Sequence, residues 1–543
     1  MTNKLKQFII TILFLYVAAF GLAQETGDRV YTNLEDALRE PLKVKSLRLA
    51  YRDFKELPAD IKLFKNLESL NLKKCRNLDL TDAFDKLSEL SKLKELDLAF
   101  CWFTSIPENI AVLKELESIN LRDNNFNELP EQLAELPKLK KVNLRHTKYL
   151  NPWKGIEVLK QIEDLQELDL SYSHISVVPE SIGELKGLVK LDLEGNVFTT
   201  LPASISQLQS LKELNLKRNT EADWPQVLKA ISEIPIEVLN LQNCKLVIVP
   251  KEIGDITSLK YLDLRANGVI SIPKSFSNLG NLEVLKLGYD QLGNNPNRLK
   301  IFPKSITKLS KLVELDLSGN RLLKIPGSIK NMTSLKRLDL SFNLFEKFPN
   351  IRGLGDLEVL RVGYNGYQYF PDWLGEFTNL KEFYAPADYF LIARYKVKFL
   401  TPGITNLVNL EILDLNDQVI YELPDDIGKL SKLRILRMRG NLLSKIPDAI
   451  GELQNLEELN VKANELEYFP ESFIKLKKLQ YLNISFNWQL GMADVSLKLE
   501  QMKWLKTLDL SYLSIRQVLY EEIVAALADT KIVYRSVNNL KLK

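Results

Sequence analysis

Apolar residues return in a fixed order along almost the whole chain, from Val44 onward. The order is L-x-x-L-x-L-x-x-N-x-L-x-x-I/L-P-x-x-I-x-x-L, and residues 188–208 and 433–453 are clean copies of it. We number positions within a copy from its first apolar residue. Apolar residues at positions 4 and 6, with polar residues at 3, 5 and 7, alternate with a period of two. Each copy is therefore predicted to contain a short strand with one buried and one solvent-facing side.

Twenty copies follow one another, and twelve of the nineteen intervals between them are 23 residues long. Units that each bury one face against a neighbour predict a stacked array rather than several globular domains. The copies, numbered 1 to 20, begin at residues 44, 67, 93, 116, 139, 165, 188, 211, 236, 259, 282, 312, 335, 357, 380, 410, 433, 456, 479 and 505.

Two polar or rigid residues are expected to shape the turns of each copy. Asparagine recurs at position 9, where its amide can satisfy backbone groups that stacking hides from water. Proline at position 15 ends the extended segment and starts a short helical or 3-10 turn. The asparagines are Asn124, Asn196, Asn219, Asn267, Asn320, Asn343, Asn365, Asn441, Asn464 and Asn487, and examples of the prolines are Pro130, Pro202, Pro326 and Pro447.

This period and motif resemble those of the leucine-rich repeat family, in particular the 23-residue class of plant disease-resistance-like and Ras-pathway scaffold proteins. The resemblance implies an α/β solenoid: a horseshoe of about 20 repeats with a parallel β-sheet on the concave side and short helical or 3-10 turns on the convex side. We place this solenoid at residues 44–518.

Both ends of such a stack need caps. We assign residues 24–43 to the N-terminal cap, with its main part over 33–40, and residues 519–543 to the C-terminal cap, with a helix over about 520–528 and a strand near 532–534. Eukaryotic extracellular members of the family usually carry cysteine-rich caps, and this sequence has none. Their absence favours a bacterial protein.

The first 23 residues have the order of a secretory signal peptide. Lys4 and Lys6 precede an apolar run over 8–20, and the small residues Gly21 and Ala23 follow it. The run is shorter than the about 20 residues that a spanning helix needs. We therefore expect cleavage after Ala23 and an exported chain, periplasmic, cell-surface or secreted, without a membrane span after processing. An uncleaved membrane anchor is the alternative.

Composition gives little support for catalysis. The 543 residues include 45% hydrophobic residues, three cysteines and two histidines, and the formal net charge is +3. A near-neutral chain has no overall field that attracts nucleic acid, so no nucleic-acid partner is expected. The motifs of phosphate, zinc, redox and acyl-transfer sites are absent from the sequence. We predict a protein that is not an enzyme and uses no cofactor or metal.

The cysteines and histidines fit the repeat. Cys75, Cys101 and Cys244 all occupy position 9, where a small side chain can replace asparagine. A disulfide between Cys75 and Cys101 is the alternative. His146 and His174 belong to neighbouring copies and are interpreted as surface residues, with a metal-binding pair as the alternative.

Position 5, on the solvent side of each strand, identifies a candidate binding region. It is Asp or Asn in fifteen copies, and the exceptions are Arg48, Lys286, Arg361, Tyr384 and Arg437. Four of these lie in copies 11 to 17, and Arg and Tyr are enriched where proteins bind partners. Neutral drift among solvated positions is the alternative. The candidate ligand-binding residues are Lys286, Tyr289, Arg361, Tyr364, Tyr384, Arg437 and Arg439.

Copies 11 and 15 each carry about seven extra residues, which we place between positions 11 and 14, in 292–301 and 390–400. Parallel strands about 4.8 Å apart would put the two insertions roughly 19 Å from each other on one rim, flanking a ligand that lies across copies 12 to 14. The second insertion, with Arg394, Lys396 and Lys398 among apolar residues, is expected to contact the ligand. Packing onto the flank of the solenoid is the alternative.

These observations favour a non-catalytic protein–protein recognition module that is exported and binds a protein or peptide on its concave face. A glycan is the less favoured ligand. An intracellular or membrane-anchored signalling scaffold is the alternative, as the resemblance to Ras-pathway members implies.

Overall fold

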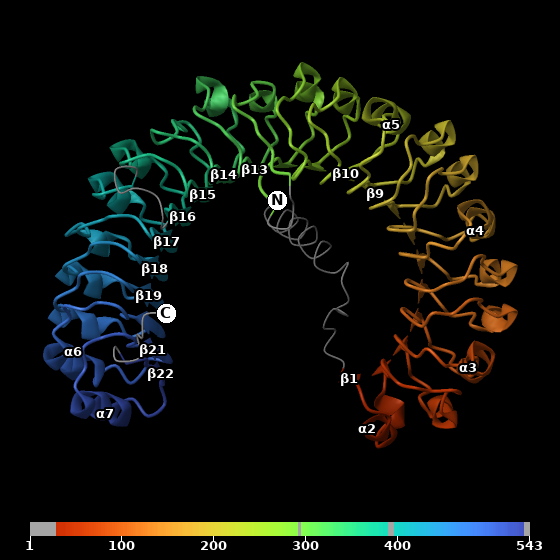
Figure 1. The fold of residues 1–543 in the computed structure, drawn as a ribbon, viewed down its shortest axis with the longest axis horizontal. Coiled ribbons are helices and arrows are strands. Elements are labelled where there is room, and N and C mark those ends of the chain that lie inside the picture. Colours follow the sequence, from red (N-terminus) through yellow and green to blue (C-terminus); the bar gives the residue numbers. More distant parts are fainter. Residues whose placement is uncertain (1–28, 291–294, 389–395, 537–543) are drawn as a thin grey trace. The chain divides into compact units, whose positions relative to one another are not determined.

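The computed structural model describes residues 29–290, 295–388 and 396–536. Within these residues the chain forms two compact units. Unit 1 contains the residues up to Asn196 together with Pro202–Leu211, and unit 2 contains Val197–Leu201 together with the residues from Lys212 onward. In each unit the strands line the concave side and the short helices line the convex side (Figure 1).

The strands of each unit pair in parallel and in chain order, so that equivalent positions of consecutive repeats lie side by side. In unit 1 they are β1 Val30–Tyr31, β2 Ser46–Arg48, β3 Ser69–Asn71, β4 Glu95–Asp97, β5 Ser118–Asn120, β6 Lys141–Asn143, β7 Glu167–Asp169 and β8 Lys190–Asp192. In unit 2 they are β9 Glu213–Asn215, β10 Val238–Asn240, β11 Tyr261–Asp263, β12 Val284–Lys286, β13 Glu314–Asp316, β14 Arg337–Asp339, β15 Val359–Arg361, β16 Glu382–Tyr384, β17 Ile412–Asp414, β18 Ile435–Arg437, β19 Glu458–Asn460, β20 Tyr481–Asn483, β21 Thr507–Asp509 and β22 Lys531–Val533.

Most repeats return through a single 3-10 turn, which proline precedes in an extended conformation, as with Pro130 at φ −70°. The 3-10 turns are η1 Pro41–Lys43, η2 Ala59–Leu63, η3 Glu108–Val112, η4 Glu131–Glu135, η5 Glu180–Glu184 and η6 Ala203–Gln207 in unit 1, and η7 Lys251–Asp255, η8 Lys274–Asn278, η9 Ile306–Lys308, η10 Gly327–Asn331, η11 Asp372–Glu376, η13 Pro402–Asn406, η14 Ile427–Lys429, η15 Asp448–Glu452 and η16 Glu471–Lys475 in unit 2. The predicted α/β solenoid, with a parallel sheet and 3-10 turns, is confirmed.

Copies 2, 5, 8 and 19, which are two or three residues longer than the 23-residue repeat, use an eight-residue α-helix instead of a 3-10 turn. These helices are α3 Leu80–Leu87, α4 Pro152–Leu159, α5 Trp224–Ile231 and α6 Met492–Leu499, and the ends of the chain add α2 Leu34–Leu38 and α7 Gln517–Ala526. The apolar side chains of strand and helix fill the space between the two layers. In copy 17, for example, Leu436, Met438 and Ile450 are fully buried.

The position 9 asparagines bind the backbone of neighbouring repeats. In copy 13, the Asn343 amide nitrogen donates to the carbonyl oxygens of Leu317 at 2.9 Å and Leu340 at 3.1 Å. The Asn343 amide oxygen accepts from the backbone nitrogen of Leu322 at 3.0 Å. One buried side chain therefore satisfies three backbone groups in two copies, which confirms the role predicted for position 9.

All three cysteines are buried free thiols. The sulfur atoms of Cys75, Cys101 and Cys244 donate to the position 6 carbonyl of the preceding copy, at 3.4, 3.4 and 3.2 Å. The asparagines use the same acceptor. The interpretation of the cysteines as asparagine replacements is confirmed, and the disulfide between Cys75 and Cys101 is wrong.

The two long copies are interrupted earlier than predicted. In copy 11 the position 9 residue is Asn297, whose amide nitrogen donates to the position 6 carbonyls of its own copy and the preceding one, at 2.9 and 3.0 Å. In copy 15 the backbone nitrogen of Val397 donates to Gln418 at 2.8 Å, the bond made by a position 11 residue. The predicted placement between positions 11 and 14 is wrong, because the extra residues follow position 8. Residues 291–294 and 389–395 lie outside the described part of the chain.

The ends of the described chain are covered by short elements. Asn33 caps α2, and its side-chain oxygen accepts from the Glu35 backbone nitrogen at 2.9 Å. At the other end α7 begins at Gln517, three residues earlier than predicted, and β22 pairs with β21. The predicted signal peptide, residues 1–23, lies outside the described residues. None of the helices in the described part of the chain combines the length and apolar character that crossing a membrane requires.

Candidate binding face of unit 2

The seven predicted binding residues lie on or just after strands β12, β15, β16 and β18 of unit 2. Two of them, Arg361 and Tyr384, face each other in the β15–β16 pairing. The Arg361 guanidinium lies 4.1 Å from the centroid of the Tyr384 ring, and the Tyr384 hydroxyl donates to Glu382 at 3.0 Å. Burial raises the pKa of Tyr384, so the hydroxyl stays a donor at neutral pH. Strand pairing thus assembles a cation, a ring and a carboxylate from two repeats.

The position 5 cations of this region are paired with carboxylates. In every case the partner is a glutamate at position 3 of the next copy, which strand pairing places diagonally opposite. Pairing fixes the long side chains and leaves the face with little net charge, so it offers oriented hydrogen-bonding groups rather than a broad positive field. The pairs are Lys286 with Glu314, Arg361 with Glu382, and Arg437 with Glu458.

Two arginines of copy 17, at positions 5 and 7, are each fixed by a carboxylate. The Nε and Nη2 atoms of Arg437 donate to the two carboxylate oxygens of Glu458, at 2.7 and 3.1 Å. The Glu458 carboxylate raises the pKa of Arg437. Arg439 forms an ion pair with Asp417. Gly440 has a φ of +68°, and a Cβ there would meet the Asp417 carboxylate at 2.3 Å, so glycine leaves the space in which Asp417 reaches Arg439.

Three aromatic rings, Tyr289, Phe342 and Tyr364, form a row across copies 11 to 14, called the aromatic row below. The rings of Phe342 and Tyr364 are stacked, and the Tyr289 centroid lies 6.2 Å from that of Phe342. Gly319 makes room for this approach, because a Cβ there would meet the Cβ of Tyr289 at 2.6 Å. The three side chains are 43%, 48% and 37% exposed. Exposed aromatic groups of this kind commonly contact protein partners.

The backbone beneath the aromatic row is strained. Phe342 and Tyr364 occupy position 8 with φ values of +54° and +56°. Most copies have a left-handed residue at position 8, and copies 7, 12 and 17 use glycines there, Gly195, Gly319 and Gly440. The left-handed conformation costs an aromatic residue roughly 1 kcal/mol of conformational free energy, whereas glycine adopts it without this cost. Side chains of many kinds occupy this position in other copies, so what distinguishes copies 13 and 14 is the stacking of two exposed rings.

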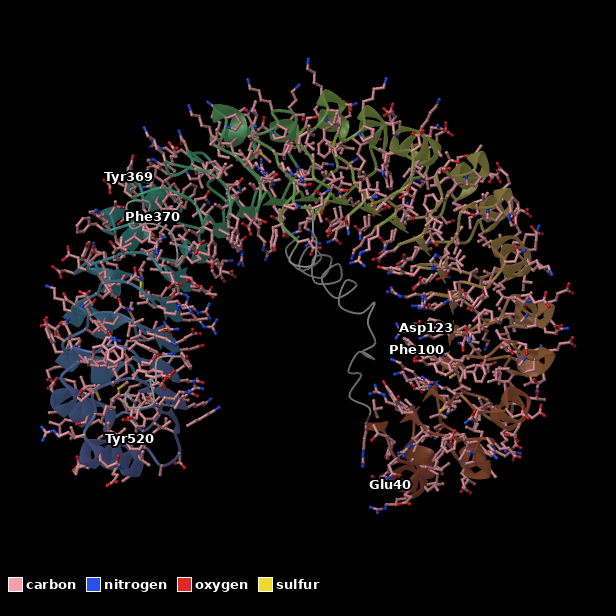
Figure 2. The ribbon with its side chains drawn as sticks, viewed as in Figure 1. Glu40, Phe100, Asp123, Tyr369, Phe370 and Tyr520 are labelled. Carbon is pink, nitrogen blue, oxygen red and sulfur yellow. The ribbon has the colours of Figure 1, made fainter. Side chains whose placement is uncertain are left out.

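An aromatic cluster in the core supports this face from below. The Phe370 ring lies 5.8 Å from that of Phe348 and 5.3 Å from that of Phe383, in edge-to-face geometry. Phe383 precedes Tyr384, so it packs inward while Tyr384 faces solvent. Phe370 is buried and its chain neighbour Tyr369 is exposed, so the two side chains take opposite directions (Figure 2). Rigid packing beneath β16 fixes the positions of the residues above it.

One carboxyl group of the face titrates near neutral pH. Burial and the neighbouring Asp316 raise the pKa of Asp339 to about 6, against hydrogen bonds from Ser341 and the charge of Arg361. The three residues Asp316, Asp339 and Arg361 follow one another at position 5 of adjacent strands. The charge of the face therefore depends on pH in a mildly acidic range.

The sequence interpretation missed several members of this face: Phe342, Asp417 and the three glutamates at position 3. The sequence does contain a pattern that identifies these residues. Each position 5 cation in copies 11 to 17 is followed by a glutamate at position 3 of the next copy, and Phe342 shares position 8 with Tyr289 and Tyr364. Reading positions across copies, rather than along one copy, would have identified these residues.

The second insertion differs from its prediction. Lys396, expected to contact a ligand, is buried, and its ammonium donates to the Asp417 carbonyl at 2.8 Å. Burial lowers the pKa of Lys396. Packing onto the solenoid, the alternative, therefore holds for Lys396, while Lys398 and Phe399 are exposed. Arg394 lies outside the described residues.

The histidines lie on the surface of unit 1, as interpreted from the sequence. His146 and His174 are exposed, and the Nδ1 atom of His146 lies 2.6 Å from the Asp123 carboxylate. Across the residues that the structure describes, no group of three His, Cys, Asp or Glu side chains could hold a metal ion.

Several solved structures are similar to this chain. A leucine-rich repeat protein of Leptospira interrogans is 28% identical, with 93% of this chain and 99% of that chain covered and a TM-score of 0.46. The ectodomain of the Arabidopsis thaliana receptor kinase GASSHO1/SCHENGEN3, in complex with CASPARIAN STRIP INTEGRITY FACTOR 2, is 22% identical over 90% of this chain and 72% of that chain, with a TM-score of 0.34. The TLR13–ssRNA13 complex contains a chain 21% identical over 94% and 84%, with a TM-score of 0.58, which shows a shared fold.

Family comparison agrees with the architecture. No curated protein matches the chain. A family model described as a leucine-rich repeat region matches residues 43–171, 235–365 and 425–529, and a second one, described as a leucine rich repeat, matches residues 163–220. Parallel strands, a buried asparagine ladder and these matches over more than half of the sequence lead to one conclusion: the chain belongs to the leucine-rich repeat family.

Proposed function

We propose that the protein is an exported, non-catalytic recognition module that binds a protein partner on the concave face of unit 2. Leucine-rich repeat proteins are generally protein-interaction modules and generally lack catalytic activity. The aromatic row is the observation that carries the proposal for this chain. Its rings follow strands β12, β14 and β15, contact one another and are 37% to 48% exposed, so they present an apolar surface to solvent.

The face has the composition of a protein-binding hot spot. Because each ring is less than half exposed, a partner that covers it contributes about 1 kcal/mol of hydrophobic free energy per ring. Arg361 belongs to the same copy as Tyr364, Arg437 lies three copies further along, and both remain partly exposed beside their glutamates. Paired charges around an apolar centre select partners whose own charges complement them. The partner we propose presents an apolar side chain to the row and charged groups to the arginines.

Export rests on the order of basic, apolar and small residues before position 24. N-terminal sequencing of the protein isolated from its source tests it. A mature chain that begins at Gln24 is the expected result. A chain that retains Met1 would instead support the membrane-anchored alternative.

Binding can be tested by affinity capture with two variants that change the same repeat position. In Phe342→Asn the row loses its central ring, and in Phe486→Asn an equivalent position 8 ring of copy 19 is lost. Asparagine tolerates the left-handed backbone at both positions, so both variants should fold. We expect a partner that co-purifies with the wild-type protein and with Phe486→Asn, but at least tenfold less with Phe342→Asn. Equal capture by both variants would place the binding surface elsewhere.

A further inference from the structure

A different concave surface, in unit 1, carries unpaired positive charge. Arg48, Lys73, Lys74 and Arg122 occupy positions 5, 7 or 8 of copies 1, 2 and 4. Among the residues that the structure describes, none of the four lies within 4.0 Å of a carboxylate oxygen. In unit 2 each position 5 cation pairs with a glutamate at position 3 of the next copy. The residue at that position after Arg48 is Ser69, which has no charge. We call these four residues the basic face.

Aromatic rings contact three of these four cations. The ammonium of Lys73 and the guanidinium of Arg122 lie 4.9 and 5.0 Å from the centroid of the Phe100 ring. Lys74 lies between Tyr51 and Phe100, at 4.8 and 5.7 Å from their centroids. Figure 2 shows Phe100 on the inner side of the strands. A cation over a ring is restricted in its motion but keeps its charge, so it remains available to an anion.

The carboxylates nearest to the basic face are already engaged. Asp97 accepts hydrogen bonds from the Asn71 side chain at 2.9 Å and the Ala99 backbone nitrogen at 3.0 Å. Burial raises the pKa of Asp97 in spite of the surrounding cations. Asp123 lies against His146. The exposed Glu95, at position 3 of copy 3, is the remaining acidic side chain on these strands. Positive charge therefore dominates the surface between copies 1 and 4.

Small hydrogen-bonding side chains form the floor around these cations. Position 3 is serine in copies 1, 2 and 4, and position 5 is asparagine in copies 2 and 4. Hydroxyl and amide groups can donate to a peptide carbonyl and accept from a peptide N–H. Their small size lets a main chain approach the strands. The residues are Ser46, Ser69, Ser118, Asn71 and Asn120.

We propose that the basic face of unit 1 binds an acidic protein segment in extended conformation. Lys73 and Arg122 flank one ring, so they lie no more than about 10 Å apart, which matches carboxylates two or three residues apart on an extended chain, roughly 7 to 10 Å. Single-stranded nucleic acid fits less well. Its bases need open aromatic faces to stack on, and the Phe100 ring already has three cations around it. This surface is separate from the aromatic row, and either proposal can fail without the other.

Fluorescence anisotropy with three labelled probes tests the proposal on the full chain. The probes are a decapeptide of alternating Glu and Ser, the same peptide with Lys in place of Glu, and a ten-nucleotide oligo(dT). We expect binding of the Glu peptide, weakened by added salt, and no binding of the Lys peptide. Tighter binding of oligo(dT) than of the Glu peptide, or no binding of the Glu peptide at low salt, would overturn the proposal.

A matched pair of double variants separates this surface from general charge. Lys73→Glu/Lys74→Glu reverses two charges of the basic face, whereas Lys138→Glu/Lys154→Glu makes the same change in net charge at exposed lysines elsewhere in unit 1. The first should weaken Glu peptide binding at least tenfold and the second less than twofold. Circular dichroism shows whether the charge-reversed variant folds. If it does not, the neutral variant Lys73→Gln/Lys74→Gln replaces it in the binding measurement. Equal weakening by the two reversals would show a nonspecific charge effect and refute the site.

Discussion

The rings of Phe342 and Tyr364 lie face to face, with centroids 4.0 Å apart and an interplanar angle of 7°. Both residues belong to position 8, and both hold a left-handed backbone. Stacking brings together two strained residues of adjacent repeats on a solvent-facing surface. We infer that the two rings lower the free energy of unfolding and are kept because they are exposed. Comparing the stability of variants with and without a ring tests this inference.

Replacement of Phe342 by asparagine should change stability little. The variant loses a stacking contact of about 0.5 to 1.5 kcal/mol and is relieved of strain of roughly 1 kcal/mol. We expect the free energy of unfolding in urea to stay within about 1 kcal/mol of the wild-type value. A loss above about 3 kcal/mol would show that the ring holds the fold together and would remove the argument for a binding role.

The sequence predicts the solenoid well because the repeat encodes burial directly. Leu191 and Leu193 alternate with polar neighbours and are buried, so the period of two reveals which side each one faces. The same pattern contains no information about the sign of φ, so the strain at Phe342 could not be predicted. The pattern also cannot show that Asn297 is the position 9 residue of copy 11. That role is revealed only by its hydrogen bonds to the position 6 carbonyls.

The side-chain pairs of the candidate binding face were predicted only in part, for a related reason. Lys286 and Glu314 are 28 residues apart in the chain and form an ion pair only because adjacent strands align. A single copy therefore shows a cation but not its partner. Burial of Lys396 is a further example, because its acceptor is a backbone carbonyl that has no signature in the sequence.

Arg437 and Glu458 should show measurable coupling. Their two parallel hydrogen bonds have the geometry of the stronger ion pairs, and both side chains are partly buried. We expect Arg437→Ala and Glu458→Ala to be each destabilising and the pair to have a coupling energy of about 1 kcal/mol in a double-mutant cycle. Arg434 and Glu457 form a similar but more exposed pair, and their coupling should be smaller. Equal coupling in the two pairs would contradict the role assigned to burial.

Stability should depend on Asp339 in mildly acidic solution. The pKa of this carboxyl rises from 3.8 to about 6 on folding, so between these values it is ionised in the unfolded chain and protonated in the folded one. Its contribution to stability is fully present below pH 3.8 and is lost as the pH rises through about 6. The loss is on the order of 3 kcal/mol.

Asp339→Asn removes this titration while keeping the local hydrogen bonds. Copy 19 has the natural precedent, because Asn483 accepts from the Ser485 backbone nitrogen at 3.1 Å and from its hydroxyl at 2.7 Å. Relative to the wild type, the variant should gain stability as the pH rises from 4 to 6 in urea denaturation series. A difference between the two proteins that does not change with pH would contradict the raised pKa.

The asparagine ladder should be sensitive to truncation and tolerant of cysteine. Asn343→Ala leaves the buried backbone nitrogen of Leu322 without its acceptor, whereas the carbonyl oxygens of Leu317 and Leu340 each lose one of two donors and keep the amides of Asn320 and Asn365. We expect a loss of about 1 to 3 kcal/mol in the free energy of unfolding. Asn343→Cys keeps a donor toward the position 6 carbonyl, as Cys244 does at 3.2 Å, and should lose clearly less. Hydrogen exchange provides a local readout, because the amide of Leu322 loses its acceptor in both variants and should exchange faster in both. If alanine and cysteine prove equally destabilising, the sulfur contributes no useful hydrogen bond, and the three natural cysteines are tolerated at position 9 for their size alone.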